Sequence, residues 1–257
     1  MAPESRALHG KMAIGAALLA SIAFGFGAPA LAARGSLREA LAIRNEDGRQ
    51  AATPQVARYM IDEGGNFVLD RHDKRPLLKF DDSPEIWVLQ ATPGPRGDII
   101  YKNDAGEPML RATKLGGMTV FTQRRPAGSA AALAGASQPL RLPALGPVVL
   151  YNRLFQASVR ASRAAQHLIG FEAPDADATS DALIADAAII AVEALVTVAA
   201  RPDGRTLLSR VSKIAFVEGG KPAVALQSGV LTITVAPSQG VAGRPSSRRI
   251  LRATGVR

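Results

Sequence analysis

Short runs of β-branched and aromatic residues fill residues 66–122, and each run ends at Gly, Pro, Asn or Asp. In order they read FVLD, PLLKF, EIWVL, DIIYK, PMLRATKL and MTVFT. Runs of this length, separated by turn residues, are typical of β-strands. Leu110 and Ala112 alternate with Arg111 and Thr113, which indicates a sheet with one packed and one wet face. Because the loops are short, we expect antiparallel neighbours that follow the chain order.

The segment before this region has two competing interpretations. Thr53-Pro54 would suit the start of a helix, with Thr as N-cap and Pro at the first position. The residues from Val56 to Asp62 are compatible with a strand that ends at the Gly64-Gly65 turn. We favour the strand, so the predicted β-meander spans about 56–123. Further upstream, Ser36 and Glu39 form a capping box, which predicts a short helix through about Arg44.

A change of periodicity then predicts two helices. Residues 124–147 are rich in Ala, Gly, Pro and Ser, as in a linker or surface loop. In residues 148–169 one broad apolar stripe is predicted to face the core, opposite a polar stripe. The apolar stripe contains Tyr151, Leu154, Phe155, Val159, Ala165 and Leu168, and the polar one Arg153, Gln156, Arg160 and Arg163.

The second predicted helix, about 180–200, is apolar enough to suggest a membrane span. Asp186 and Glu193 lie inside it, and a charge at the middle of a bilayer costs roughly 2.5 to 3.5 kcal/mol. We therefore predict a buried helix, packed antiparallel to the first as an αα-hairpin.

Three more strands and a basic tail complete the chain. The strands are predicted at 213–218, 222–226 and 230–235, joined by Gly219-Gly220 and by residues 227–229. Residues 237–257 show no periodicity, contain no acidic residue and are predicted to be mobile and solvated. Their arginines are Arg244, Arg248, Arg249, Arg252 and Arg257. The predicted fold is thus α+β, with a single domain over 33–236: a largely antiparallel β-meander, a helical hairpin at about 148–200 and C-terminal strands at about 212–235.

The N-terminus has the three parts of a secretory signal. Arg6 and Lys11 precede an apolar run of about 15 residues, too short to span a bilayer, and Ala30-Leu31-Ala32 matches a signal-peptidase site. We expect cleavage between Ala32 and Ala33, which leaves a periplasmic or secreted protein without a stable transmembrane segment. The alternative is a permanent membrane anchor.

The composition excludes several kinds of functional site and favours anionic partners. The chain of 257 residues has no cysteine, which excludes disulfides, thiolate metal sites and cysteine nucleophiles. The net charge is +9, and +8 without residues 1–32. This balance favours anionic partners such as envelope polymers or lipid headgroups, whereas export argues against nucleic acid.

The meander residues also resemble a known family. The resemblance is carried by residues 67–71, 76–89, 92–98 and 115–122, which read FVLDR, PLLKFDDSPEIWVL, TPGPRGD and LGGMTVFT. These segments resemble an uncharacterised family of exported bacterial proteins, domain of unknown function 4908. The resemblance implies export and a single family domain, and it implies no catalytic residue, ligand or cofactor.

Three groups of residues are candidates for chemistry. His72 and His167 lie outside any metal or triad motif, and we expect packing or surface roles for both. Asp175, Asp177, Asp181 and Asp186 follow the spacing of a calcium loop, but Ser180 stands where that loop needs Gly. The alternative, which we favour, is that these acids stabilise a helix N-terminus. Asp81, Asp82 and Glu85 form an acidic loop of the kind that glycoside cleavage requires, although acidic turns are usually only solvated.

The sequence favours a non-enzymatic binding or structural module of the cell envelope that needs no cofactor. In this hypothesis the basic tail, with Arg244, Arg248, Arg249 and Arg252, meets an anionic surface. The alternative is a periplasmic hydrolase that uses Asp81, Asp82 and Glu85.

Overall fold

The structure, a computed structural model, describes residues 53–256, which lie in one compact unit. The predicted signal peptide, its cleavage site and the predicted helix near Ser36 lie outside the described residues.

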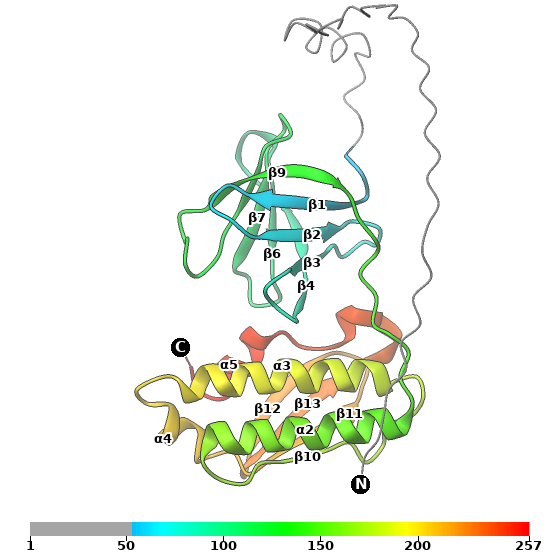
Figure 1. Cartoon of the computed structure of the whole chain (residues 1–257), viewed down its shortest axis with the longest axis vertical. Helices are drawn as coiled ribbons and strands as arrows, with labels where there is room; N and C mark the ends of the chain where they lie inside the picture. Colours follow the sequence, from blue (N-terminus) through cyan, green and yellow to red (C-terminus); the bar gives the residue numbers. More distant parts are fainter. Residues whose placement is uncertain (1–52, 257) are drawn as a thin grey trace, which may run out of the picture. The chain divides into compact units, whose positions relative to one another are not determined.

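A nine-stranded antiparallel sheet forms the first half of this unit, in the order β4-β3-β2-β1-β9-β8-β7-β6-β5. Its two edge strands, β4 and β5, are consecutive in the chain and separated only by the buried Leu89. The sheet therefore curls into a nearly closed barrel, and Figure 1 shows β6 and β7 behind β1 to β4. The strands are β1 (Val56–Ile61), β2 (Asn66–Asp70), β3 (Leu77–Phe80), β4 (Ile86–Val88), β5 (Gln90–Pro93), β6 (Ile99–Lys102), β7 (Pro108–Ala112), β8 (Met118–Val120) and β9 (Ser129–Ala136).

The predicted meander is confirmed, including the strand interpretation of residues 56–62. Chain neighbours pair throughout β1 to β4 and β5 to β9, and β1 joins the two runs by pairing with β9. Strand β9 was expected to belong to a linker, and this prediction is wrong. Its Ala- and Gly-rich sequence carries little strand propensity, but the backbone groups of β1 and β8 need a partner between them.

A second, four-stranded sheet carries the helices. Helices α2 and α3 lie side by side over one face of it (Figure 1). Its order is β10-β11-β13-β12, with β10 and β13 both parallel to β11. The elements are α2 (Pro147–Ala165), β10 (Gly170–Glu172), α3 (Asp181–Ala199), α4 (Gly204–Leu208), β11 (Lys213–Glu218), β12 (Ala223–Gln227) and β13 (Val230–Val235). The pair of helices and the three C-terminal strands are confirmed, and the fold is α+β.

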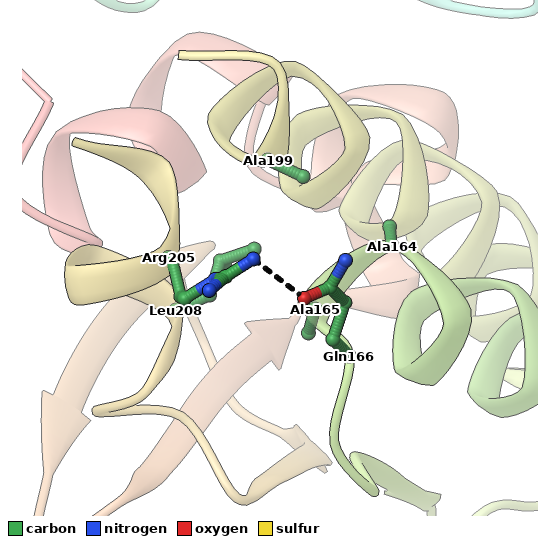
Figure 2. A pocket seen from close by; sticks show the side chains of 6 residues that line it. All are labelled: Ala164, Ala165, Gln166, Ala199, Arg205 and Leu208. Carbon is green, nitrogen blue, oxygen red and sulfur yellow. Dashed lines mark hydrogen bonds between the residues drawn. The ribbon is translucent and has the colours of Figure 1, made fainter. Parts of the chain in front are cut away.

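The direction of the helix pair differs from the prediction. Gln166 follows the end of α2 and Ala199 ends α3, yet both line one small cavity of about 80 Å³ (Figure 2). There the Gln166 amide oxygen accepts a 2.8 Å hydrogen bond from Arg205 of α4. Arg160 and Glu193, both near the C-terminal ends of their helices, form a 2.6 Å ion pair. The helices are therefore parallel, because β10 carries the chain back along the sheet before α3 begins.

Helix α3 is the core element of this layer. It is the one helix in residues 53–256 that is long and apolar enough to cross a membrane by length and composition. Ile184, Ile190, Leu195 and most of its other side chains are buried against α2 and the sheet. This burial agrees with the prediction of a tertiary-packed helix.

The predicted core stripe of α2 is only partly correct. Leu154 and Ala165 are buried as expected, but Tyr151, Phe155 and Val159 are exposed, as is Leu168 beyond the helix. The buried face instead includes Leu150, Ala157 and Ala161. The two alanines are small, so they let α2 approach α3 closely.

The predicted mobile tail is wrong for residues 237–256. These residues form a 3₁₀ segment, η2 (Pro237–Gly243), and helix α5 (Ser247–Ala253). Ile250 and Leu251 are buried in the core of the helical layer. Two apolar residues among five arginines are too weak a pattern to reveal this helix in the sequence.

Candidate functional site

A large groove lies at one end of the barrel, with a volume of about 1020 Å³. Four turns of the sheet contribute to it: those between β1 and β2, β3 and β4, β6 and β7, and β8 and β9. Its other wall comes from Glu193 and Thr197 of α3 and from Ser247, Arg248 and Leu251 of α5. Hydrogen-bonded hairpins bring these turns together, so residues from 61 to 251 meet in one concavity.

Apolar side chains line much of this groove. Phe80 and Trp87 come from the two sides of the β3–β4 hairpin, and Phe121 and Val120 from the end of β8. Trp87, the only tryptophan, is half-buried and packs against the barrel core. The Phe80 ring is held in place by Phe67, at a centroid distance of 5.9 Å. Apolar walls with a few polar groups are characteristic of sites for small ligands.

Charged side chains surround the apolar walls, and most of them are paired. Glu63 forms a 2.6 Å ion pair with Arg125, and Glu107 forms a 3.0 Å ion pair with Arg248. Arg124 and Asp82 also line the groove, and neither forms an ion pair with another residue of 53–256. The groove therefore offers one cation and one anion that are not committed within the described chain.

All three residues of the predicted acidic loop line this groove. Asp81 accepts a 2.6 Å hydrogen bond from Arg58 and a 3.3 Å bond from Asn66. Glu85 is buried, and its two oxygens accept hydrogen bonds from the Ser247 N–H at 2.9 Å and the Ser247 hydroxyl at 2.6 Å. Two of the three carboxylates are thus used to hold the fold together.

The environment of Glu85 changes its acidity. Burial raises the pKa of the Glu85 carboxyl, while Arg244 and the hydrogen bonds from Ser247 act in the opposite direction and lower the pKa. Desolvation disfavours the charged form of the carboxyl, and because its effect is the largest, the pKa is raised overall. A raised pKa is also seen in catalytic acids, but both oxygens of this carboxyl bind the first residue of α5.

Residues 244–252, which we name the docking segment, attach the C-terminus to the barrel. Only 1% of the Arg244 side chain is exposed, and its guanidinium pairs with Asp186 of α3. It also donates a 2.9 Å hydrogen bond to the Ile86 carbonyl and lies 3.8 Å from Glu85. Arg244 therefore joins α3, the β3–β4 hairpin and the C-terminal chain at one point.

The β6–β7 turn receives the rest of the docking segment. The Ser246 N–H donates a 3.1 Å bond to Asp104, and the Ser246 hydroxyl also donates to this carboxylate. Arg252 donates a 3.2 Å bond to the Ala105 carbonyl and lies 3.6 Å from Glu107. Arg249 lies 4.0 Å from Asp104.

The four arginines that we assigned to an outside anionic surface thus have anionic partners within the chain. The partners are Asp186 and Glu85 for Arg244, Glu107 for Arg248 and Arg252, and Asp104 for Arg249. Arg244 is buried and cannot reach a surface. Sequence reasoning missed this arrangement because Asp104 and Glu107 stand about 140 residues from their partners, in what looks like an ordinary hairpin turn.

The calcium-loop spacing, the interpretation that we did not favour for residues 175–186, brings no three of its carboxylates together. Asp177 accepts hydrogen bonds from the N–H groups of Thr179 at 2.7 Å and Ser180 at 3.1 Å, immediately before α3. The Thr179 hydroxyl also donates a 2.6 Å hydrogen bond to Asp177, and this bond, followed by those from the N–H groups, lowers the pKa of the Asp177 carboxyl. Asp186 is taken by Arg244, and Asp181 is buried inside the helical layer. In residues 53–256 no three His, Asp or Glu side chains are grouped to hold a metal ion.

Both histidines have local partners away from the groove. The His72 ring lies 3.3 Å from the Gln55 side-chain oxygen. The His167 ring nitrogens lie 3.1 Å from the Ala165 carbonyl and 2.8 Å from the Val211 carbonyl. The His167 ring therefore connects the end of α2 to the segment between α4 and β11.

Comparison with known proteins gives one match. The model of the family DUF4908, a domain of unknown function, matches residues 36–254. The match includes the meander, the helical layer, the docking segment and α5. No curated protein and no solved structure matches the chain.

Proposed function

The chain belongs to the DUF4908 family, and we propose that this member is a non-enzymatic binding module of the cell envelope. Its site is the groove at the end of the barrel, and its ligand is an amphiphile with an apolar part and a charged or polar end. The single observation that carries this proposal is the apolar wall of Phe80, Trp87 and Phe121 beside the charged groups Arg124 and Asp82.

The size and lining of the groove support a ligand of moderate size. Sites for small molecules commonly occupy about 300 to 1000 Å³ and combine apolar walls with a few polar groups that orient the ligand. The groove, at about 1020 Å³, is at the upper end of this range. Its aromatic side chains would contact the apolar part of an amphiphile, and Arg124 would attract an anionic head group.

Export supports the envelope location. The N-terminus has a positive region, an apolar run and an A-x-A site, which together are typical of a cleaved signal. Mass spectrometry of the native protein should find a mature N-terminus at Ala33. A protein in the envelope fraction that still carries Met1 would contradict export.

The hydrolase hypothesis has less support. Its strongest observation is the raised pKa of Glu85 inside the groove. A general acid must be free to reach its substrate, whereas Ser247 occupies both Glu85 oxygens and Arg58 holds Asp81. Hydrolysis of an envelope glycan that disappears in both Glu85→Gln and Asp81→Asn, with the fold intact, would favour the hydrolase over the binding module.

Trp87 provides a direct test of ligand binding. Because it is the only tryptophan and lines the groove, its fluorescence reports on this site alone. Titration of the protein with laurate, an amphiphile with one carboxylate, should give a saturable change in emission. Phe121→Ala should weaken binding about five-fold or more, since truncation of an aromatic contact costs more than about 1 kcal/mol.

The matched control is Phe155→Ala, which removes an exposed phenylalanine of α2 outside the groove. This variant should bind laurate as the parent does. A titration without saturation, or equal affinities for the parent and Phe121→Ala, would refute the groove as the site.

A further inference from the structure

The end of the barrel that lies opposite to the groove carries an exposed leucine. Strands β6 and β7 are joined to each other at the groove, so the turns at their other ends, β5–β6 and β7–β8, lie at the opposite end of the barrel. Leu115 in the β7–β8 turn is 92% exposed, more than any other large apolar residue of 53–256. The β7–β8 turn therefore presents an apolar side chain to solvent at its tip.

The β7–β8 turn holds Leu115 in this position. The Gly116 N–H donates a 3.0 Å hydrogen bond to the Thr113 carbonyl, and the Thr113 N–H donates a 2.8 Å bond to the Gly117 carbonyl. Gly116 has a φ of 88°, which glycine adopts without steric cost. Gly, Asn, Asp and Ser are the usual residues of such turns, so Leu115 has no role in forming this one. A lone exposed leucine is common on protein surfaces, but the neighbouring turn adds apolar area and charge to this one.

The β5–β6 turn extends the apolar surface. Asp98 accepts a 3.4 Å hydrogen bond from the Lys114 N–H, so the two turns are in contact. Pro95 is exposed in the β5–β6 turn, and Ile99, at the start of β6, is 41% exposed. Leu115, Pro95 and Ile99 thus lie on two adjoining turns at the same end of the barrel.

The exposed charges of these two turns are positive. Arg96 and Lys114 are exposed, and neither forms an ion pair with another residue of 53–256. Asp98 is buried and forms a 2.5 Å ion pair with Arg111, so its charge is balanced within the chain. Arg96 has a positive φ of 59°, and a left-handed backbone at a residue with a side chain is uncommon and often belongs to a functional turn. The surface that we name the far-end tip consists of Pro95, Arg96, Ile99, Lys114 and Leu115.

We propose that the far-end tip binds a membrane surface that contains anionic lipids. Leu115 would enter the boundary between headgroups and acyl chains, while Arg96 and Lys114 contact lipid phosphates. A small apolar insertion combined with basic residues gives reversible binding, which increases with the buried apolar area and with the anionic lipid content. The groove lies at the other end of the barrel, so the bound protein would keep it open to water. The far-end tip is distinct from the groove and does not depend on the ligand proposed for it.

Other partners fit the far-end tip less well. A soluble anionic polymer would be bound by Arg96 and Lys114 alone and would leave the Leu115 side chain in water. A specific protein interface uses roughly 20 to 30 residues on each side, whereas the far-end tip has five. A membrane uses the charge and the apolar tip together, because phosphates and acyl chains lie within a few ångström of each other at its surface.

The test is co-sedimentation of the chain from Ala33 onward with vesicles at low salt. One set contains phosphatidylcholine alone, and the other contains phosphatidylcholine with phosphatidylglycerol. We expect binding to the anionic set only. Arg96→Gln/Lys114→Gln should weaken it about 25-fold, since each cation near an anionic surface contributes about five-fold. Leu115→Ser should weaken binding about ten-fold or more, because the burial of the leucine side chain in the interface is lost.

A matched control uses α2, where Phe155 is 62% exposed and Arg163 is also exposed. Phe155→Ser/Arg163→Gln removes the same kinds of group from another surface and should leave binding unchanged. Equal binding by the parent and the Leu115→Ser variant would overturn the proposal, because the partner would then be recognised by charge alone. So would a loss of binding in the α2 variant that Leu115→Ser does not show, because α2 would then be the surface in contact with the membrane.

Discussion

Replacement of Arg244 by methionine tests whether the docking segment holds the structure together. The side chain is 1% exposed, and its charge is balanced by Asp186 and Glu85, whose side chains are 11% and 6% exposed. Methionine keeps most of the length of arginine but removes the charge and the hydrogen bond to the Ile86 carbonyl. Breaking a buried ion pair in this way typically costs about 3 to 5 kcal/mol, because the remaining charge has no partner.

The cost should show in urea unfolding monitored by Trp87 fluorescence and circular dichroism. A loss of about 3 to 5 kcal/mol is a large part of the roughly 5 to 15 kcal/mol by which native proteins are stable. Arg58→Met is the matched control, because both side chains of the Arg58–Asp81 ion pair are exposed. Exposed ion pairs contribute about 0 to 1 kcal/mol to the free energy of unfolding. Equal losses in the two variants, or a loss below about 1 kcal/mol for Arg244→Met, would refute the structural role of Arg244.

The same variant should respond to pH. Arg244 lowers the pKa of Glu85, so its removal lets the pKa of this carboxyl rise further. Protonated Glu85 needs no cationic partner. The destabilisation by Arg244→Met should therefore be smaller at pH 5 than at pH 7, and an increase of this loss toward acidic pH would contradict the assigned contact.

Three further outcomes follow from particular contacts. Leu154→Ala should lower the free energy of unfolding by about 2 to 5 kcal/mol and Phe155→Ala by about 0.5 kcal/mol or less, because only Leu154 faces the core. Equal losses of unfolding free energy for the two variants in urea titrations would contradict the assignment of Leu154 to the buried face of α2. Burial raises the pKa of Glu85, so the stability that the protonated carboxyl contributes is present below its ordinary pKa of 4.5 and is lost as pH rises through the higher pKa of the folded state. Glu85→Gln should remove this pH dependence from the free energy of unfolding. Identical pH profiles for the parent and the variant would count against a buried Glu85. Gly243→Ala would press a Cβ against the Ala236 carbonyl oxygen, so we expect a loss of about 1 to 3 kcal/mol by thermal unfolding, whereas Gly106→Ala has open space and tests only the cost of its positive φ of 82°.

The strands of the meander could be predicted because their residues and turns act locally. Gly106 and Gly116, with positive φ, close two hairpins at the positions where the sequence places them. Strand β9 lacked such signals: SAAALAGA has no β-branched residue, and only the free edges of β1 and β8 make it a strand. Its role is set by distant partners, so a local pattern could not reveal it.

Helix α2 shows a different limit. Leu150, Leu154, Ala157 and Ala161 have helical spacing, and so do Val148, Tyr151, Phe155 and Val159. The predicted stripe combined Tyr151, Phe155 and Val159 of the second set with Leu154 of the first, because large apolar side chains favour a core position, but close packing with α3 requires the small residues of the first set. The choice between two apolar faces depends on the partner helix, which the periodicity of one segment does not describe.

The candidate site was predictable in part. The acidic loop was identified as a cluster, and the structure places Asp81, Asp82 and Glu85 in the groove. The aromatic wall and the α5 wall were not foreseen: the first joins Phe80 and Trp87 to Phe121, 41 positions after Phe80, and the second joins residues more than 100 positions apart. The arginines of the C-terminus were recognised as functional cations, whereas their partners, Asp104, Glu107 and Asp186, lie inside the same chain.

The docking segment is made more than 100 residues after the last barrel strand, which gives the folding of this protein a fixed order. Strands β1 to β9 are complete by Ala136, and domains generally fold N-terminus first during synthesis. Glu85 and Asp104 must then wait for Ser246 and Ser247, which are made about 140 to 160 residues later. A stop codon just before Arg244 would leave a nascent barrel in which Glu85 has lost both Arg244 and the hydrogen-bond donors of Ser247. Synthesis of residues 244–252 thus decides whether the groove acquires the α5 part of its second wall.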